Sequence, residues 1–271
     1  MPELPEVQTI LDTLEKKIKD LKITDIKVIY KPIVLGSERT FKKKLIGQHF
    51  RDFQRRGKYL LFEMDDITLV SHLRMEGKYF ILDDSVPLSK HDHVIFYLSD
   101  GSQLRYNDVR KFGRMELIEK SDDYRDFKDL GPEPFSKDFS LAYCKAELSK
   151  RKKPIKSVLL DQSFVAGIGN IYADEILFAI RIHPLTPSDK LDDDDIRKLI
   201  KETRRILKRA IKAGGTTIRS YTSSLGVTGR FQLSLSVHTV ENCPVCKTRI
   251  RKITVGGRGT YFCEKCQVLK S

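Results

Sequence analysis

The sequence has no tryptophan and no long apolar run, and it does not begin like an exported protein. Met1 is followed by Pro2-Glu3 rather than by a basic and then an apolar stretch, so no secretory signal is expected. No apolar run approaches the roughly 18 residues that indicate a membrane span. Four of the five cysteines lie in two close pairs, which fits a reducing cytoplasm better than a disulfide framework. We therefore expect a cytoplasmic protein without a membrane partner.

Acidic residues are also in deficit: 37 Asp and Glu stand against 50 Lys and Arg, giving a net charge of +13. Proteins this basic often bind a polyanion, because each phosphate contact releases condensed counterions. A basic surface that only keeps the protein soluble would give the same charge, so composition favours nucleic acid without deciding it. A chain of 271 residues with 40% hydrophobic content can form two domains with cores of their own.

The first half of the chain predicts a helix followed by strands. Apolar residues recur at helical spacing over 5–20, where Pro5 suits the first turn. Residues 22–119 form short strand-like segments with no helix alternating between them, which favours an antiparallel sandwich over a parallel sheet. The expected strands include 23–30, 58–64, 68–73, 93–98 and 115–118, with Asp100-Gly101 as a turn.

The second half is helical. After Gly131-Pro132-Glu133-Pro134, helices are expected at 138–149, 154–162, 171–180 and 192–213, the last ending at Gly214-Gly215. Asp192 begins an acidic run that suits the start of that helix, and Cys144 is expected to be buried packing. The predicted fold class is α+β, with an N-terminal antiparallel β-sandwich over 1–130, a helical domain over 131–235 and a small cysteine unit over 236–271.

The cysteine pairs Cys243-Pro-Val-Cys246 and Cys263-Glu-Lys-Cys266 are separated by 16 residues. Two such pairs can place four thiolates tetrahedrally around one Zn²⁺. Because no coordination position stays open, the zinc is expected to be structural and to supply folding energy to a segment with little core. Between the pairs, 250–255 and 260–262 should form a hairpin. Residues 241–271 carry seven Lys/Arg and two Asp/Glu, as expected for a finger that faces DNA.

Pro2 suggests a second kind of chemistry. Its small ring generally permits removal of Met1, which leaves a secondary amine. An α-amino group titrates near pH ~7.7–8.0, so an appreciable part of it is neutral at pH 7. When such an amine attacks a sugar C1′, the product is an iminium, an electron sink for elimination. Glu3 could protonate the opening ring, and Glu6 lies one helical turn away. In isolation, however, these residues fit the start of a helix better.

A series of motifs runs in order along almost the whole chain. They are Pro2-Glu3-Leu4-Pro5-Glu6-Val7, Arg55-Arg56-Gly57-Lys58-Tyr59-Leu60, Ser71-His72-Leu73-Arg74-Met75-Glu76-Gly77, Lys90-His91-Asp92-His93, Asp108-Val109-Arg110-Lys111-Phe112-Gly113, Leu130-Gly131-Pro132-Glu133-Pro134, Gly167-Ile168-Gly169-Asn170-Ile171-Tyr172, Gly214-Gly215-Thr216-Thr217 and Gly257-Arg258-Gly259-Thr260. Together they resemble the formamidopyrimidine-DNA glycosylases, bacterial enzymes that remove oxidised purines.

The resemblance implies a β-sandwich, a helical domain with a helix–two-turn–helix motif and a zinc finger, with DNA in the cleft between the domains. It implies a bifunctional glycosylase/AP lyase of base-excision repair that acts near the bacterial nucleoid on double-stranded DNA with oxidised or abasic sites. A monomer is expected, since a single lesion is not a symmetric site. Pro2 would be the Schiff-base nucleophile, Glu3 a proton donor, Lys58 the proton donor of β-elimination and Arg258 the residue that serves δ-elimination.

Further positions match residues that contact DNA in the family. Met75, Arg110 and Phe112 would fill the gap left when the damaged base is flipped out, although alone Met75 and Phe112 would be interpreted as sandwich core. Asn170 would present its amide to a phosphate at a helix start. The remaining matches are His91, Arg151 and Lys156.

The chain departs from the family at three places. Gln8 stands where Glu is usual, and Ser157 follows Lys156 where Pro is common. The segment 237–243, Val-His-Thr-Val-Glu-Asn-Cys, is shorter than the family's approach to the first Cys, which usually reads Val-Tyr-Gly-Arg. This last change bears on the docking angle of the finger and the reach of Arg258, but not on the nucleophile.

Two other functions explain part of the sequence. The related endonuclease VIII branch prefers oxidised pyrimidines, but typically has Gly at the position of Leu4 and lacks the set Met75, Arg110 and Phe112, so oxidised purines are favoured. A non-enzymatic zinc-ribbon DNA-binding protein would explain the charge and the cysteines but not the Pro2-Glu3 start. A Ser/Thr-rich loop at 217–225 is expected to close over the flipped base.

Overall fold

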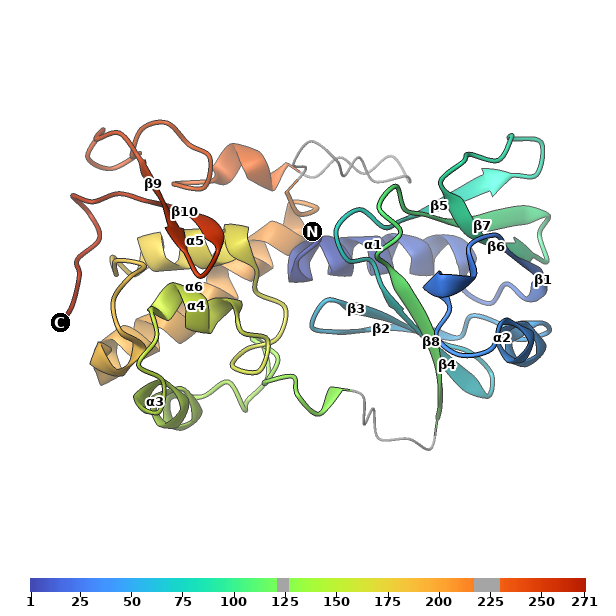
Figure 1. Cartoon of the computed structure of the whole chain (residues 1–271), viewed down its shortest axis with the longest axis horizontal. Helices are drawn as coiled ribbons and strands as arrows, with labels where there is room; N and C mark the ends of the chain where they lie inside the picture. The colour runs from blue at the N-terminus through green and yellow to red at the C-terminus, as the bar shows by residue number, and fades with distance from the viewer. Residues whose placement is uncertain (121–126, 217–229) are drawn as a thin grey trace. The chain divides into compact units, whose positions relative to one another are not determined.

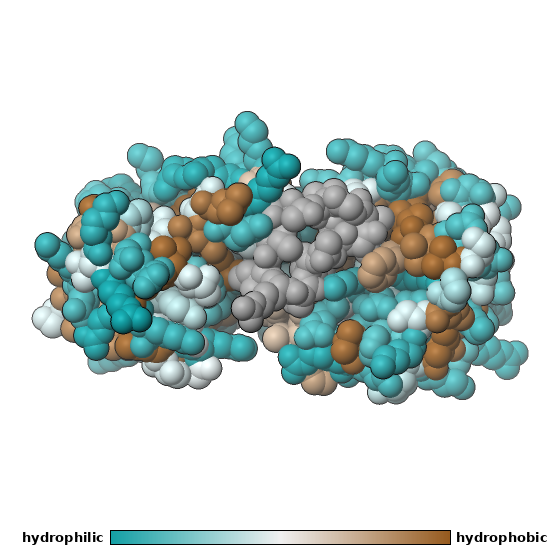
Figure 2. Space-filling model, turned by 90° about the horizontal axis from the view of Figure 1, so that it is seen from above, coloured by the Kyte–Doolittle hydropathy of each residue, from teal (hydrophilic) through white to brown (hydrophobic). Residues whose placement is uncertain are grey.

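The computed structural model describes residues 1–120, 127–216 and 230–271, and the chain divides into two compact units (Figure 1). Unit 1 contains Met1–Lys128 and the described residues 214–216, and unit 2 contains Asp129–Ala213 and Arg230–Ser271. The loop predicted at 217–225 lies outside the described residues. On the face shown in Figure 2, hydrophilic side chains cover most of the described surface and hydrophobic ones gather in small patches. No described helix has the length and apolar character needed to span a bilayer.

Unit 1 is a helix packed on a β-sandwich, as predicted. Helix α1 (Leu4–Ile18) buries an apolar stripe that includes Val7, Leu11 and Leu14 against the sandwich. One antiparallel sheet has the order β1 (Ile23–Val28), β6 (Asp92–Leu98), β7 (Ser102–Asn107), β5 (Lys78–Asp83). The other has the order β2 (Asp52–Arg56), β3 (Tyr59–Glu63), β4 (Ile67–His72), β8 (Arg114–Glu119).

One detail of the predicted sandwich is wrong, because helix α2 (Glu38–Leu45) lies between β1 and β2, after the short 3₁₀ helix η1 (Lys31–Ile33). The Ser37 hydroxyl caps α2 by accepting a hydrogen bond from the Thr40 N–H. Only Phe41 and Leu45 are buried in it. Two apolar positions in eight residues do not make a clear helical period, so the sequence pattern does not reveal it.

Unit 2 contains the predicted helices and the hairpin. Its elements are α3 (Leu141–Ser149), α4 (Ile155–Leu160), α5 (Asn170–Ala179), η3 (Ser188–Lys190), α6 (Asp193–Lys212), η4 (Phe231–Ser234), β9 (Arg251–Val255) and β10 (Arg258–Phe262). As predicted, Asp192 caps α6, accepting hydrogen bonds from the N–H groups of Asp194 (3.0 Å) and Asp195 (2.9 Å). Helix α5 packs against α4, α6 and β10, so it lies at the centre of the unit.

Candidate functional site

The amino terminus of the chain is fixed by the first turn of α1. Pro2 and Glu3 are buried, and the Glu3 N–H donates to Glu6 Oε2 at 2.9 Å. Burial lowers the pKa of the Met1 amino group, while the carboxylates of Glu3 and Glu6 oppose this shift. An amine in these surroundings is neutral more often at pH 7 than an exposed one, which favours nucleophilic attack.

The carboxylate of Glu6 joins this first turn to the segment that follows α6. Glu6 Oε1 accepts hydrogen bonds from the Thr216 N–H (2.8 Å) and the Thr216 hydroxyl (3.0 Å). Gly215 has φ +76°, and a Cβ there would lie 2.8 Å from Glu6 Oε1. Gly215 is therefore required for the close approach, and Glu6 is a fixed acceptor rather than a mobile acid.

Lys58 lies near the amino terminus, in the two-residue turn between β2 and β3. The turn begins with Gly57 at φ +56°, and Lys58 is only 7% exposed. Its charge acts on the Met1 amino group, where it adds to the effect of burial in lowering the pKa. The structure thus brings Pro2, Glu3 and Lys58, three of the four predicted catalytic residues, into one region of unit 1.

His72 belongs to the same region, and nothing in the sequence singles it out beyond its place in a matched motif. Burial, followed by the charges of Arg74 and Lys58, lowers the pKa of His72 to about 3. Its Nδ1 accepts a hydrogen bond from the Arg74 N–H at 2.9 Å. His72 is therefore neutral, with its proton on Nε2, and adds an N–H donor beside Lys58.

The predicted gap-filling residues lie in two neighbouring loops of unit 1. Met75 is in the β4–β5 loop, and Arg110 and Phe112 are in the β7–β8 loop. A glycine of each loop packs against the Tyr106 hydroxyl. A Cβ on Gly77 would lie 2.4 Å from this oxygen, and a Cβ on Gly113 would lie only 1.6 Å from it. The two glycines therefore allow the two loops to meet.

Phe112 is not part of the sandwich core. The residue is 47% exposed, and the Arg110 guanidinium lies 4.7 Å from the centroid of its ring. Met75 is half-buried. The core interpretation is thus wrong for Phe112, whose exposed ring suits insertion into a base stack.

Asp108 holds the Phe112 loop in place. Its fully buried carboxylate accepts hydrogen bonds from the backbone N–H groups of Arg110 (3.0 Å), Phe112 (2.9 Å) and Gly113 (2.9 Å). The Tyr106 hydroxyl donates to the same carboxylate at 3.3 Å. One ionised side chain thereby fixes the backbone on both sides of the wedge residue.

We expect Asp108→Asn to lower the free energy of unfolding by about 2 kcal/mol, because the amide turns a donor toward N–H groups that need an acceptor. Affinity for a duplex with an abasic site should fall about tenfold as the loop loses its order. Urea denaturation and a binding titration measure the two effects. Asp83→Asn is the matched control, since the exposed Asp83 makes a similar loop contact with Ser85; equal losses in both variants would count against the assignment.

His91 lies in a loop that the buried side chain of Arg105 supports. Arg105 donates to the carbonyls of Val86 (2.7 Å) and Pro87 (3.1 Å), and the Asp108 N–H donates to the His91 carbonyl at 3.0 Å. The His91 backbone is therefore fixed, and a DNA contact of its ring stays a prediction.

The four paired cysteines come together in unit 2. Their Sγ atoms all lie within 4.8 Å of one another, with 3.8 Å between Cys243 and Cys266 and 3.4 Å between Cys246 and Cys263. A tetrahedral site with Zn–S bonds of about 2.3 Å requires sulfur atoms roughly 3.8 Å apart. The set fits one Zn²⁺ with four protein ligands. Cys144 is buried in α3, and burial raises the pKa of its thiol to about 12.

The hairpin β9–β10 carries Arg258 next to the start of α5. It turns at Gly256 (φ +55°) and Gly257 (φ +73°), so the exposed Arg258 is the first residue of β10. The Asn170 Nδ2 donates to the Gly259 carbonyl at 2.8 Å. Gly259 directly follows Arg258 in the chain. The hydrogen bond therefore holds Asn170 and Arg258, two residues predicted to contact DNA, close to each other.

The Lys156 ammonium is buried inside unit 2. Its side chain is 0% exposed, forms an ion pair with Asp174 and donates to the Asn170 carbonyl at 3.0 Å. A buried ammonium without its partner would be costly, so this pair is retained inside the unit. The structure gives Lys156 two protein partners, and its part in DNA binding stays a prediction.

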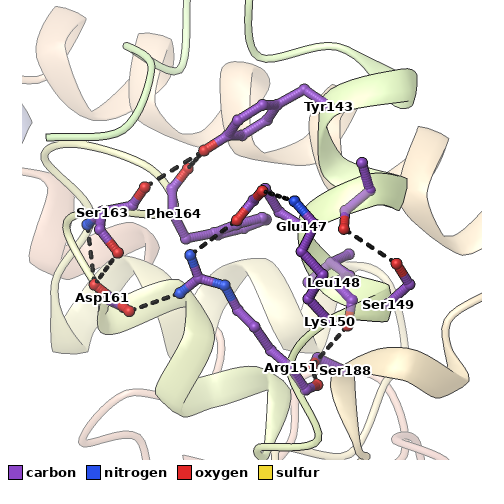
Figure 3. Close-up of polar contacts among 11 residues, drawn as sticks. Tyr143, Glu147, Leu148, Ser149, Lys150, Arg151, Asp161, Ser163, Phe164 and Ser188 are labelled. Carbon is purple, nitrogen blue, oxygen red and sulfur yellow. Dashed lines mark hydrogen bonds and ion pairs between the residues drawn. The ribbon is translucent and has the colours of Figure 1, made fainter. Parts of the chain in front are cut away.

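Arg151 lies between two carboxylates, as Figure 3 shows. Its guanidinium pairs with Glu147 at 3.0 Å and with Asp161 at 2.7 Å, while 22% of the side chain stays exposed. Asp161 also accepts hydrogen bonds from the N–H and hydroxyl of Ser163 (2.9 and 2.7 Å). These two ion pairs give Arg151 a structural role, and a DNA contact stays a prediction.

Comparisons with known proteins agree with this site along the whole chain. Family models match for the formamidopyrimidine-DNA glycosylase N-terminal domain over residues 1–115, the H2TH domain of the same enzymes over 130–222, and the zinc finger found in FPG and IleRS over 241–268. The formamidopyrimidine-DNA glycosylase of Ligilactobacillus salivarius is 48% identical over 276 residues, with 100% of both chains covered. The chain belongs to the formamidopyrimidine-DNA glycosylase family.

Other members of the formamidopyrimidine-DNA glycosylase family show the same agreement. The Bacillus subtilis enzyme is 46% identical over 276 residues, again with 100% of both chains covered. A solved complex of Lactococcus lactis Fpg with DNA that contains an abasic site superposes with a TM-score of 0.93 at 45% identity, covering 98% of this chain and 99% of that one. The predicted family, fold class and zinc finger are confirmed.

Proposed function

We propose that this chain is a bifunctional DNA glycosylase/AP lyase that removes oxidised purines through a Schiff base on Pro2 and then nicks the strand. The observation that carries the proposal is the position of Pro2, which is buried just before α1 beside Glu3, with the buried Lys58 near the same end of the chain. A DNA-binding protein without catalysis needs no such site. Family membership agrees with the proposal, since Lactococcus lactis Fpg was solved with abasic and with N7-benzyl-Fapy-dG DNA.

The chemistry follows from the secondary amine. After removal of Met1, the Pro2 nitrogen attacks C1′ while the bond from C1′ to the damaged base breaks, and the amine's proton passes to the departing base. Glu3 then supplies a proton to the ring oxygen as the sugar ring opens to the iminium. The resulting iminium draws electrons from C2′, whose proton passes to water as the C3′–O bond breaks. In this β-elimination Lys58 donates a proton to the departing 3′ phosphate. Arg258 serves the δ-elimination that releases the 5′ phosphate. Water then hydrolyses the remaining iminium and frees Pro2.

DNA binding divides among three groups of residues in this proposal. Met75, Arg110 and Phe112 occupy the gap in the duplex, and Phe112 is suited to this by its exposed ring. His91, Arg151, Asn170 and Arg258 contact the phosphate backbone. Lys156 acts indirectly, through Asp174. The zinc finger holds Arg258 in place, and its zinc would take no part in bond breaking, since the four cysteines leave no coordination position for substrate.

Three further features belong to the proposal. The sandwich over 1–130, the helical domain over 131–235 and the finger over 236–271 act as separate domains. The protein works as a monomer, because one lesion offers one binding site. It acts in the bacterial cytoplasm, at the nucleoid.

Borohydride trapping tests the reaction and the choice of lesion. Protein verified to begin at Pro2 is mixed with duplexes containing 8-oxoguanine opposite cytosine or dihydrouracil opposite guanine, and borohydride reduces the iminium to a stable adduct. We expect an adduct with both, formed faster with 8-oxoguanine. Faster trapping with dihydrouracil would assign the chain to pyrimidine repair, and no adduct with either lesion would rule out the lyase.

A further inference from the structure

A buried carboxylate at the centre of unit 2 binds three segments that are far apart in the sequence. Asp174 of α5 is 1% exposed. Its Oδ1 pairs with the Lys156 ammonium of α4, and its Oδ2 accepts hydrogen bonds from His238 Nδ1 at 2.7 Å and from the Tyr261 N–H of β10 at 3.2 Å. Since a carboxylate only accepts, His238 Nδ1 carries a proton.

The same network holds the residues of the proposed phosphate contact. Lys156 also donates to the Asn170 carbonyl at 3.0 Å, and the Asn170 side chain donates to the Gly259 carbonyl at 2.8 Å. Asp174 is thus linked to Asn170 through Lys156, and to β10 through Tyr261. Arg258 begins that strand, three residues before Tyr261.

His238 is held so that its ring faces Asp174. The buried carboxylate of Glu175 accepts hydrogen bonds from the N–H groups of Ser236 (2.8 Å), Val237 (2.9 Å) and His238 (3.0 Å). The ring of His238 packs edge-on against that of Tyr261, with 4.9 Å between centroids. His238 is also part of the shortened segment before the first cysteine, the departure from the family that the proposed function leaves unexplained.

We propose that His238 and Asp174 form a positioning pair that sets the hairpin β9–β10, and with it Arg258, relative to Asn170. The inference rests on the proposed function, in which Arg258 and Asn170 contact phosphate. Without the His238 donor, the Tyr261 N–H is the one donor left to Oδ2 among the residues described, and its hydrogen bond is the longer of the two. The carboxylate then turns toward Lys156, and β10 loses its hydrogen bond to Asp174 while the one from Asn170 to Gly259 remains. A shift of about 1 Å in a catalytic group can cost about 100-fold in rate.

A pair of substitutions separates this role from ordinary stabilisation. His238→Phe keeps a ring against Tyr261 but has no donor, whereas His238→Asn keeps an N–H donor near the position of Nδ1. Both are purified with zinc content measured, and each is assayed on an 8-oxoguanine duplex. The readouts are the ratio of β,δ- to β-elimination product, the rate of borohydride trapping, and the slope of log binding constant against log salt on an abasic duplex.

For His238→Phe we expect the β,δ to β ratio to fall about tenfold or more, with trapping within about threefold of wild type, because Pro2 lies in unit 1. The salt slope should become shallower by about 0.9 for each phosphate that the variant no longer neutralises. His238→Asn should restore both quantities most of the way. If His238→Phe does not bind zinc, His238→Gln, whose amide lies beyond the Nδ1 position, takes its place with the same expectation.

One result would contradict the positioning role of His238 and Asp174. A His238→Phe protein with full zinc, unchanged product ratio and unchanged salt slope would show that the pair only stabilises the unit. Failure of the proposed function is a separate result, namely a wild-type protein that forms no adduct. In that case the salt slopes of the two variants still decide whether the pair positions the residues that bind phosphate.

Discussion

Protein with one extra residue before Pro2 will form the borohydride adduct at least about 100-fold more slowly than protein that begins at Pro2. An extra residue converts the secondary amine into an amide, whose nitrogen lone pair is delocalised into the carbonyl and does not attack C1′. Retention of Met1 should have the same effect. The first turn of α1 fixes Pro2 where Glu3 and Lys58 lie, so the added residue's own amine stands displaced from that position.

Single-turnover trapping on an 8-oxoguanine duplex measures this effect, and mass spectrometry of the digested adduct identifies the nitrogen that reacted. The control is a protein with one residue added at the carboxyl terminus, which should form the adduct at the same rate as protein that begins at Pro2 without any addition. Pro2→Gly, with a free primary amine at the same position, should react measurably but more slowly. Equal trapping by the extended and the processed protein would assign the nucleophile to another amine, and the mapped peptide would name it.

Removal of zinc, by chelation or by Cys246→Ser, will unfold the finger and weaken binding to an abasic duplex by about 100-fold or more at physiological salt. Structural zinc contributes an apparent ~10–16 kcal/mol to the folding of zinc-finger peptides. The short hairpin has no other source of stability of that size. Among the described residues, the small core around Cys243 and Cys263 has Phe178 and Val237 as its other buried members. Loss of the hairpin also removes Arg258 from its place beside Asn170.

Zinc quantification, circular dichroism and a binding titration test this expectation together. Cys144→Ser is the matched control: Cys144 is buried in α3 outside the metal set, so this variant should keep one zinc and bind DNA normally. The sandwich of unit 1 has its own core and should keep its strand signal after chelation. Zinc-free protein that binds the abasic duplex as tightly as the loaded form would show that the finger has no role in binding.

Local chemistry accounts for the predictions that the sequence supported well. The cysteine spacing by itself indicated the zinc site, because two short turns place four thiolates whatever the rest of the fold does. The helical period and the acidic cap predicted α6, since both act within a few residues. Helix α2 could not be predicted in this way, because packing of Phe41 and Leu45 against the sandwich, rather than a local pattern, defines it.

Pro2 shows the limit of the sequence most directly. From its own neighbours it was better explained as the start of a helix, and only the order of motifs along the chain favoured a nucleophile. The tertiary structure decided the environment, since Lys58 is 56 residues away from Pro2 in the sequence and Thr216 is 210 residues away from Glu6. Burial and charge at that point depend on chain segments that no local pattern relates.

For the charged residues too, the sequence determined some properties and the tertiary structure decided others. The sequence by itself determined the family, the zinc ligands and the basic character that suits DNA. Only the tertiary structure decided that the Lys156 ammonium pairs with Asp174 inside unit 2, and that Asp108 supports the exposed Phe112 loop. The physical reason is that a charged side chain is stable in the interior only with a partner, and that partner is brought to it by the fold rather than by sequence neighbours.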